Sequence, residues 1–133
     1  MNEKETMRIL VLDDEPIVCK RLQPALEKKG YEVETFYRSE DALKRFVEKP
    51  FEIVITDLKM KGLDGMKFLT EVKKVSPKTE VIVITGFATM ETAKESFRQG
   101  VFDFLAKPFK LGEIQEGIQK AAMKIRQSQS EIE

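Results

Sequence analysis

The sequence predicts an α/β fold in which a doubly wound, five-stranded parallel sheet carries helices on both faces. Short apolar runs, typical of buried strands, alternate along the chain with segments of helical periodicity. We count five such strand and helix pairs, and this alternation is typical of a parallel sheet covered on both sides. With 133 residues and 41% hydrophobic side chains, the chain can bury one core of ordinary size.

The five predicted strands differ in how apolar they are. Residues 9–12, 53–55 and 81–84 are wholly apolar, as expected for strands buried on both faces. Residues 31–36 alternate apolar and acidic side chains, and residues 101–106 contain an acid. Because half-polar strands belong at sheet edges, we expect the second and fifth strands at the edges and the other three in the middle.

The helical segments carry start and stop signals. Pro16 begins the first segment, and Pro24 inside it should kink or split the helix. Ser39 precedes the second segment, which stops before Pro50, and Gly100 ends the fourth. The apolar positions at helical spacing in the third and fifth segments are Met66, Leu69 and Val72, and Leu111, Ile114, Ile118, Ala122 and Ile125. By default these stripes face the core.

Composition excludes several classes of function. Lys plus Arg and Asp plus Glu are both 23, so the net charge is zero and no direct nucleic-acid binding is expected. Cys19 is the only cysteine, which rules out an internal disulfide and fits a reducing compartment. No apolar run approaches the roughly 20 residues that cross a bilayer, and residues 1–6 lack the hydrophobic segment of a signal peptide. We therefore expect a cytoplasmic domain without membrane contact.

The chain contains no histidine. This excludes a Ser/His or Cys/His nucleophile pair, a His-ligated zinc site and a phosphohistidine on this chain. The chemistry must therefore rest on carboxylates, lysine and hydroxyls.

Acidic side chains follow two strands that we expect to be neighbours. Asp13 and Asp14 come directly after the first strand, and Asp57 comes after the third. With right-handed crossovers these strands meet where the winding reverses, and ligands bind outside their carboxyl ends. Strands lie roughly 4.8 Å apart, so the three carboxylates would share a site and a hard cation such as Mg²⁺ would relieve their repulsion. The structural alternative is that Asp14 or Glu15 caps the helix that Pro16 begins.

Two further strand ends add a neutral and a positive group. Thr85 ends the fourth strand and Lys107 ends the fifth. A hydroxyl and an ammonium opposite the metal would hold a phosphoryl group that a carboxylate attacks. The alternatives are a Thr85 hydroxyl that satisfies local backbone groups and a solvated surface Lys107.

The chain resembles the receiver domain of two-component response regulators over residues 7 to about 126. The residues that carry the resemblance fall in the family's order: Asp13-Asp14, Asp57, Thr85 and Lys107-Pro108. The resemblance implies a flavodoxin-like (βα)5 fold with strand order 2-1-3-4-5. Residues 1–6 and 127–133 carry little apolar surface, so we expect a disordered extension before the domain and a frayed tail or the start of a linker after it.

The resemblance also implies a role for each acid. Asp57 would be the phosphoacceptor and Asp14 a direct Mg²⁺ ligand. Asp13 would be a ligand through water, and Lys59 would offer its backbone carbonyl. Lys59 and Phe87 occupy positions that tune, in this family, how fast the phosphoryl group is lost.

Further along the chain, the resemblance implies phosphoryl contacts and a switch. Thr85 and Lys107 would bind the phosphoryl oxygens, and Phe104 would be the rotating switch aromatic. For Phe104 the alternative of simple core packing stays open.

As a function, the resemblance implies a phosphoacceptor signalling switch. A partner sensor histidine kinase or phosphotransfer protein would donate the phosphoryl group, and the domain would catalyse its own modification and a slow dephosphorylation. The surface of the fourth helix, fifth strand and fifth helix would then change to control a downstream effector domain or protein. A homodimer formed on phosphorylation is one expected outcome.

Three rival functions differ in the motif that each requires. A phosphatase or mutase of the haloacid dehalogenase type has its nucleophile in a DxD after the first strand, whereas this chain has adjacent acids in "LDDEP". A flavodoxin-like cofactor binder needs a Gly/Ser/Thr-rich phosphate loop where this chain places acids. The third rival is a receiver-like, partner-binding module without phosphorylation, and the full set of acids, hydroxyl and lysine argues against it.

Overall fold

The computed structural model describes residues 6–58 and 65–132, and in these residues five strands alternate with five helices. The strands are β1 (Arg8–Leu12), β2 (Glu32–Phe36), β3 (Ile53–Thr56), β4 (Glu80–Thr85) and β5 (Asp103–Ala106). The helices are α1 (Pro16–Lys28), α2 (Ser39–Glu48), α3 (Gly65–Val75), α4 (Met90–Arg98) and α5 (Leu111–Ile132). The predicted alternation of strand and helix is confirmed.

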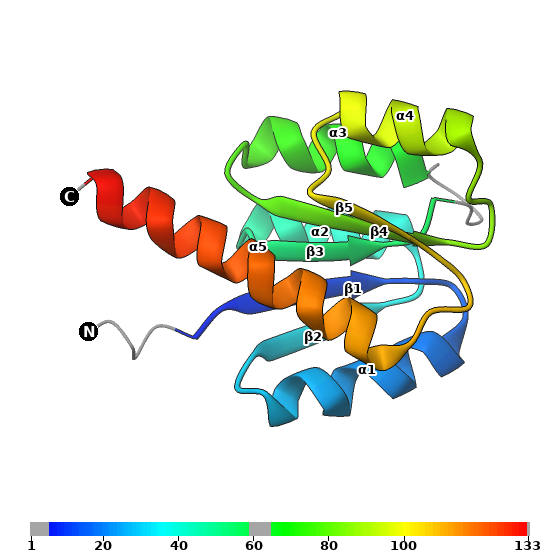
Figure 1. The fold of residues 1–133 in the computed structure, drawn as a ribbon, viewed down its shortest axis with the longest axis horizontal. Helices are drawn as coiled ribbons and strands as arrows, with labels where there is room; N and C mark the ends of the chain where they lie inside the picture. Colours follow the sequence, from blue (N-terminus) through cyan, green and yellow to red (C-terminus); the bar gives the residue numbers. More distant parts are fainter. Residues whose placement is uncertain (1–5, 59–64, 133) are drawn as a thin grey trace.

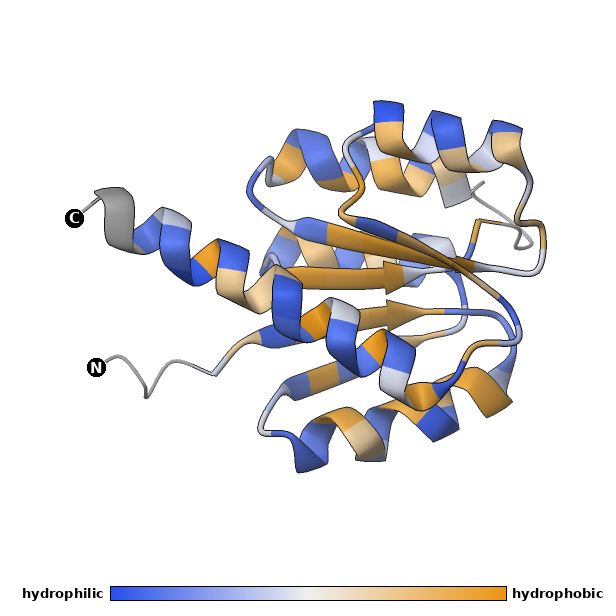
Figure 2. Ribbon diagram, in the orientation of Figure 1, coloured by the Kyte–Doolittle hydropathy of each residue, from blue (hydrophilic) through white to orange (hydrophobic). Residues whose placement is uncertain are grey.

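The strands form one parallel sheet in the order β2-β1-β3-β4-β5, as predicted (Figure 1). β1 pairs with both β2 and β3, so the winding reverses at β1. Every residue of β1, β3 and β4 is buried, whereas β2 and β5 are partly exposed. Figure 2 shows a matching difference in hydropathy: the central strands are largely hydrophobic, whereas the edge strands are mixed. The predicted division into middle and edge strands is therefore confirmed.

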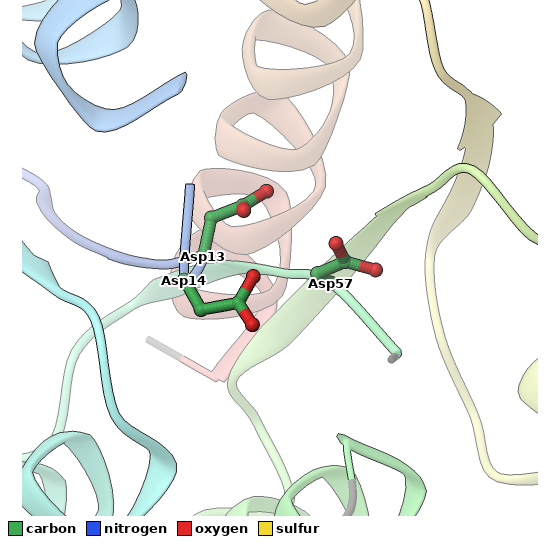
Figure 3. Close-up of side chains that lie close together, drawn as sticks. All are labelled: Asp13, Asp14 and Asp57. Carbon is green, nitrogen blue, oxygen red and sulfur yellow. The ribbon is translucent and has the colours of Figure 1, made fainter. Parts of the chain in front are cut away.

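Two apolar cores lie on opposite faces of the sheet. α1 and α5 cover one face, where Leu22 and Ile118 are fully buried. α2 and α3 cover the other face, where Phe46 and Phe68 are fully buried. The C-cap residue of α4, Gln99, contacts α3, because the Thr70 hydroxyl donates to its side-chain oxygen at 3.2 Å. The carboxyl ends of the parallel strands lie at one edge of the sheet, and this edge carries the predicted acids (Figure 3).

α1 and α5 differ from the expectations for their segments. α1 runs unbroken from Pro16 to Lys28 although Pro24 lies inside it, so the proline does not split the helix. Leu22 and Leu26 are fully buried on either side of Pro24, and each stabilises the helix by about 1.5–3 kcal/mol, which offsets the roughly 3 kcal/mol cost of an interior proline. α5 continues to Ile132, past the expected domain end at residue 126.

No helix among the described residues has the length and apolar character needed to cross a membrane.

Candidate functional site

Three acids converge at the carboxyl edge of the sheet. The backbone N–H of Asp57 donates to Leu12 O at 3.1 Å, and that of Asp13 donates to Phe36 O at 3.1 Å, so both residues continue the strand ladder. Asp14 comes next and is exposed. One carboxylate oxygen from each acid lies within 4.8 Å of the others. Figure 3 shows the side chains of these acids together after β1 and β3.

The Lys107 ammonium lies among these carboxylates. Its Nζ is 2.8 Å from Asp13 Oδ2, 2.8 Å from Asp57 Oδ2 and 2.6 Å from Glu15 Oε1. The Lys107 side chain is only 15% exposed, so the alternative of a solvated surface lysine is wrong. Burial alone would lower the pKa of Lys107, but its contacts with Asp13, Asp57 and Glu15 outweigh burial and hold that pKa above its ordinary value.

Asp13 is the most constrained acid of the site, because its side chain is fully buried. Its Oδ1 accepts the backbone N–H of Glu15 at 2.9 Å. Its Oδ2 is paired with Lys107 by charge, but accepts no well-directed hydrogen bond from the residues that the structure describes. Burial raises the pKa of Asp13, although the Lys107 and Glu15 contacts act in the opposite direction. A buried carboxylate oxygen with spare acceptor capacity is well suited to a cation.

Thr85 is fully buried at the end of β4. Its Oγ1 accepts the Phe87 N–H at 3.0 Å, and its carbonyl accepts the Lys107 N–H at 2.8 Å. The Thr85 hydroxyl oxygen therefore accepts a local backbone N–H, as the alternative reading of Thr85 expected. A hydroxyl that accepts in this way can also donate its own O–H to a further acceptor. The Lys107–Pro108 peptide bond that follows β5 is cis.

The last two candidates lie further from the acids or outside the described residues. Phe104 is on β5, three residues before Lys107, and it packs half-buried against the core under α2 and α3. Its place in this core is compatible with both packing and switching. Lys59 lies outside the residues that the structure describes.

Comparison with known proteins identifies the family and supports the fold. Residues 9–119 match the response regulator receiver domain family. The chain belongs to this family. The chain is 36% identical over 124 residues to the transcriptional regulatory protein ZraR of Salmonella typhimurium, covering 93% of this chain and 28% of that protein. The chain thus spans less than a third of this curated relative's length.

Solved receiver domains have the same architecture. A CheY-like receiver domain from Methanospirillum hungatei superimposes with a TM-score of 0.90 at 25% identity, covering 93% of this chain and 99% of that one. A response regulator from Burkholderia pseudomallei, solved with a phosphorylated aspartic acid, a calcium ion and citrate, has a TM-score of 0.80 at 27% identity, covering 92% and 72%. Family membership supports a phosphoacceptor switch that controls an output, and it gives no support to the three rival functions.

The sequence reasoning did not place two residues that shape this receiver site. Glu15 was considered only as a helix cap, yet its carboxylate contacts Lys107; the available signal was a third acid directly after the aspartate pair. Gly65 begins α3 against the end of β3, and a Cβ there would lie 2.5 Å from Leu58 Cα and 2.6 Å from Asp57 O. Only glycine allows this close approach, so Gly65 lets the start of α3 pack directly against the backbone of Asp57 and Leu58.

Proposed function

We propose that Asp57 is the phosphoacceptor of this receiver domain and takes its phosphoryl group from the phosphohistidine of a sensor histidine kinase or phosphotransfer protein. The observation that carries the proposal is the position of the Asp57 carboxylate, at the carboxyl end of a central strand and 2.8 Å from the Lys107 ammonium. The phosphorylated aspartic acid named for the B. pseudomallei regulator supports the same chemistry in the family.

In this proposal Asp13, Asp14 and Asp57 hold Mg²⁺, with the backbone carbonyl of Lys59 as a further ligand. The buried Asp13 Oδ2 and the close spacing of the three carboxylates fit a hard cation that prefers oxygen ligands and keeps several waters. When bound, Mg²⁺ supplies positive charge that reduces repulsion between the carboxylates and the phosphoryl oxygens.

The chain's own groups then carry the transfer. An Asp57 carboxylate oxygen attacks phosphorus, the P–N bond to the partner's histidine breaks, and the bonding electron pair leaves with the imidazole nitrogen. The Lys107 ammonium neutralises charge on the phosphoryl oxygens, and the Thr85 hydroxyl donates to one of them. Water attack on the phosphorus of the resulting acyl phosphate reverses the modification more slowly.

The response reaches the output through the face formed by α4, β5 and α5. Thr85 moves toward the new anion and Phe104 fills the space it vacates, which shifts the α4 face between two populations. The output is a downstream effector domain or protein, as the name of the longer transcriptional regulatory protein ZraR suggests, and phosphorylation also favours a homodimer.

The proposal also includes the bounds of the domain and its location in the cell. The receiver domain comprises residues 7 to 126, with residues 1–6 as an extension; since α5 continues as a helix to Ile132, we assign the segment after residue 126 as the start of a linker rather than a frayed tail. We place the domain in the cytoplasm and assign it no direct contact with nucleic acid or membrane.

The test is the intact mass of the protein after incubation with a small acyl phosphate and Mg²⁺. We expect one added phosphoryl group on the parent protein and none on Asp57→Asn, which keeps the size of the side chain but removes the anionic nucleophile. Far-UV circular dichroism checks that the variant is folded. A phosphoryl group on a carboxylate of Asp57→Asn contradicts the acceptor assignment.

A further inference from the structure

The Lys107 ammonium contacts three carboxylates, and the proposed function assigns a role to only two of them. Its three N–H donors face Asp13, Asp57 and Glu15, and the 2.6 Å contact with Glu15 is the shortest of the three. Asp13 and Asp57 have roles as metal ligand and phosphoacceptor. Glu15 has neither role, and its side chain is 57% exposed at the mouth of the site.

The backbone around Glu15 explains why its side chain reaches Lys107. Glu15 occupies the N-cap position of α1 with an extended backbone, φ −93° and ψ 106°, and Pro16 follows at the first helical position. Its backbone N–H is fixed on Asp13 Oδ1. A residue at this position commonly caps the helix with its side chain, but Glu15 makes no such bond. Its carboxylate is directed across the sheet edge to the end of β5 instead.

We propose that Glu15 is a positioning residue that holds Lys107 and slows phosphoryl transfer to Asp57 by competing with the incoming phosphoryl group for the ammonium. The inference rests on the proposed function. A cation shared by Asp13 and Asp57 would satisfy these two acids without Lys107, whereas Glu15 would keep its attraction for the ammonium. Lys107 must therefore leave or share the Glu15 carboxylate in order to bind the phosphoryl oxygens.

Substitutions at Glu15 separate this contact from a general effect of charge. Glu15→Gln removes the charge and keeps the length, so we expect the second-order rate constant for phosphorylation to rise about two- to fivefold, the range of an exposed ion pair. Glu15→Asp keeps the charge but shortens the side chain and favours helix capping, so it should accelerate transfer as Glu15→Gln does. If Glu15 merely repelled the anionic donor, Glu15→Asp would instead behave like the parent.

The experiment follows intact mass against time in acetyl phosphate and Mg²⁺ over a range of donor concentrations. It compares the parent, both Glu15 variants, and Glu15→Gln combined with Lys107→Ala. Glu27→Gln is the matched control, because Glu27 is exposed on the same helix, twelve residues or roughly 18 Å further along by helix rise. We expect acceleration by both Glu15 variants, no effect of Glu27→Gln, and no effect of Glu15→Gln in the Lys107→Ala background.

Several outcomes overturn the inference. It fails if Glu15→Gln reacts at the parent's rate, if Glu15→Asp does, or if the acceleration persists without Lys107. These failures leave the proposed function intact, because the parent would still be modified at Asp57. If the parent takes up no phosphoryl group at all, the proposed function fails and the inference falls with it.

Discussion

α3 and α4 both follow a central strand, yet they are held in different ways. α3 buries Gly65, Phe68, Leu69 and Val72 against the sheet. In α4 the one buried residue is Ser96, whose hydroxyl donates to Thr92 O at 2.8 Å. The large apolar side chains of α4 face solvent, with Met90 75% and Phe97 50% exposed. Apolar burial holds α3 against the sheet, whereas these polar bonds of α4 lie within the helix and its cap.

The difference explains which helix can carry a signal. Each fully buried Phe or Leu of α3 contributes about 1.5–3 kcal/mol, so moving α3 would cost several kcal/mol. α4 is fixed at its start by the reciprocal bonds of Thr89 and Thr92, and it sits over a small buried surface. A coupling free energy of about 1–3 kcal/mol, typical of allosteric sites, is then enough to shift its population. The predictions below test this contrast.

The largest expected effect comes from matched phenylalanine truncations in the two helices. Phe68→Ala should lower the free energy of unfolding by about 3–5 kcal/mol, because it removes a fully buried ring and leaves a cavity. Phe97→Ala should lower it by less than about 1 kcal/mol, because half of that ring is already in water. Urea denaturation followed by far-UV circular dichroism measures both. Equal losses would show that α4 is as firmly packed as α3.

The next effect compares the glycines that precede or begin the same two helices. Gly65→Ala should destabilise the fold by about 1–3 kcal/mol, because the new methyl group overlaps the backbone of Leu58 and Asp57. A Cβ at Gly86 meets nothing within 4 Å, so Gly86→Ala should change stability by less than about 1 kcal/mol. The same denaturation assay applies. A neutral Gly65→Ala would show that the start of α3 shifts freely from the site.

The contrast between α3 and α4 also separates what the sequence predicts from what depends on the tertiary structure. The polarity of the strands predicted which two lie at the edges, and the full strand order came from the family resemblance. The meeting of Asp13 and Asp57 followed from the rule that parallel strands end at one edge. Met90 and Phe97 lie seven residues apart, at helical spacing, but this spacing does not indicate whether their face of the helix is covered. Burial depends on neighbouring elements, and periodicity within one segment does not encode it.

Contacts between residues far apart in the sequence are the second feature that the sequence patterns do not predict. The Glu15 contact with Lys107 joins residues 92 positions apart, and it depends on a flexible side chain turning away from the cap that its position favours. Gly65 gave no periodic signal either, because its role is a close approach between two backbones. Both features become visible only when the tertiary structure sets the distances.

The third prediction concerns Asp13 without metal, at the edge from which α3 starts. Burial raises the pKa of Asp13 above its ordinary value of 3.8, so the folded state binds this proton more tightly than the unfolded state. Its contribution to stability is therefore full below pH 3.8 and is lost as pH rises through the folded pKa. Relative to Asp13→Asn, the parent should lose stability as pH rises through that window in EDTA. Added Mg²⁺ should raise the stability of the parent more than that of the variant, which keeps Asp14 and Asp57 but lacks one of the three carboxylates.

Urea denaturation of both proteins at a series of pH values measures this difference. Asn keeps the Oδ1 acceptor for the Glu15 N–H, so the comparison isolates the ionisation. A difference between the two proteins that does not change with pH would contradict the assigned direction.

The last prediction concerns the response to phosphorylation rather than stability, and Phe104 is the sharpest test of the relay to α4. Phe104→Ala should still accept a phosphoryl group, because the ring touches none of the proposed chemistry, but it should reduce the amide NMR shifts of residues 86–100 on phosphorylation. Phe102→Ala is the matched control, since Phe102 is also half-buried but packs on the opposite face with α1 and α5. Thr85→Ala should reduce the response as Phe104→Ala does, whereas Thr85→Ser keeps the hydroxyl and should respond like the parent. If Phe104→Ala and Phe102→Ala both respond like the parent, Phe104 is a core residue only, and the weak packing of α4 is coupled to the site by another route.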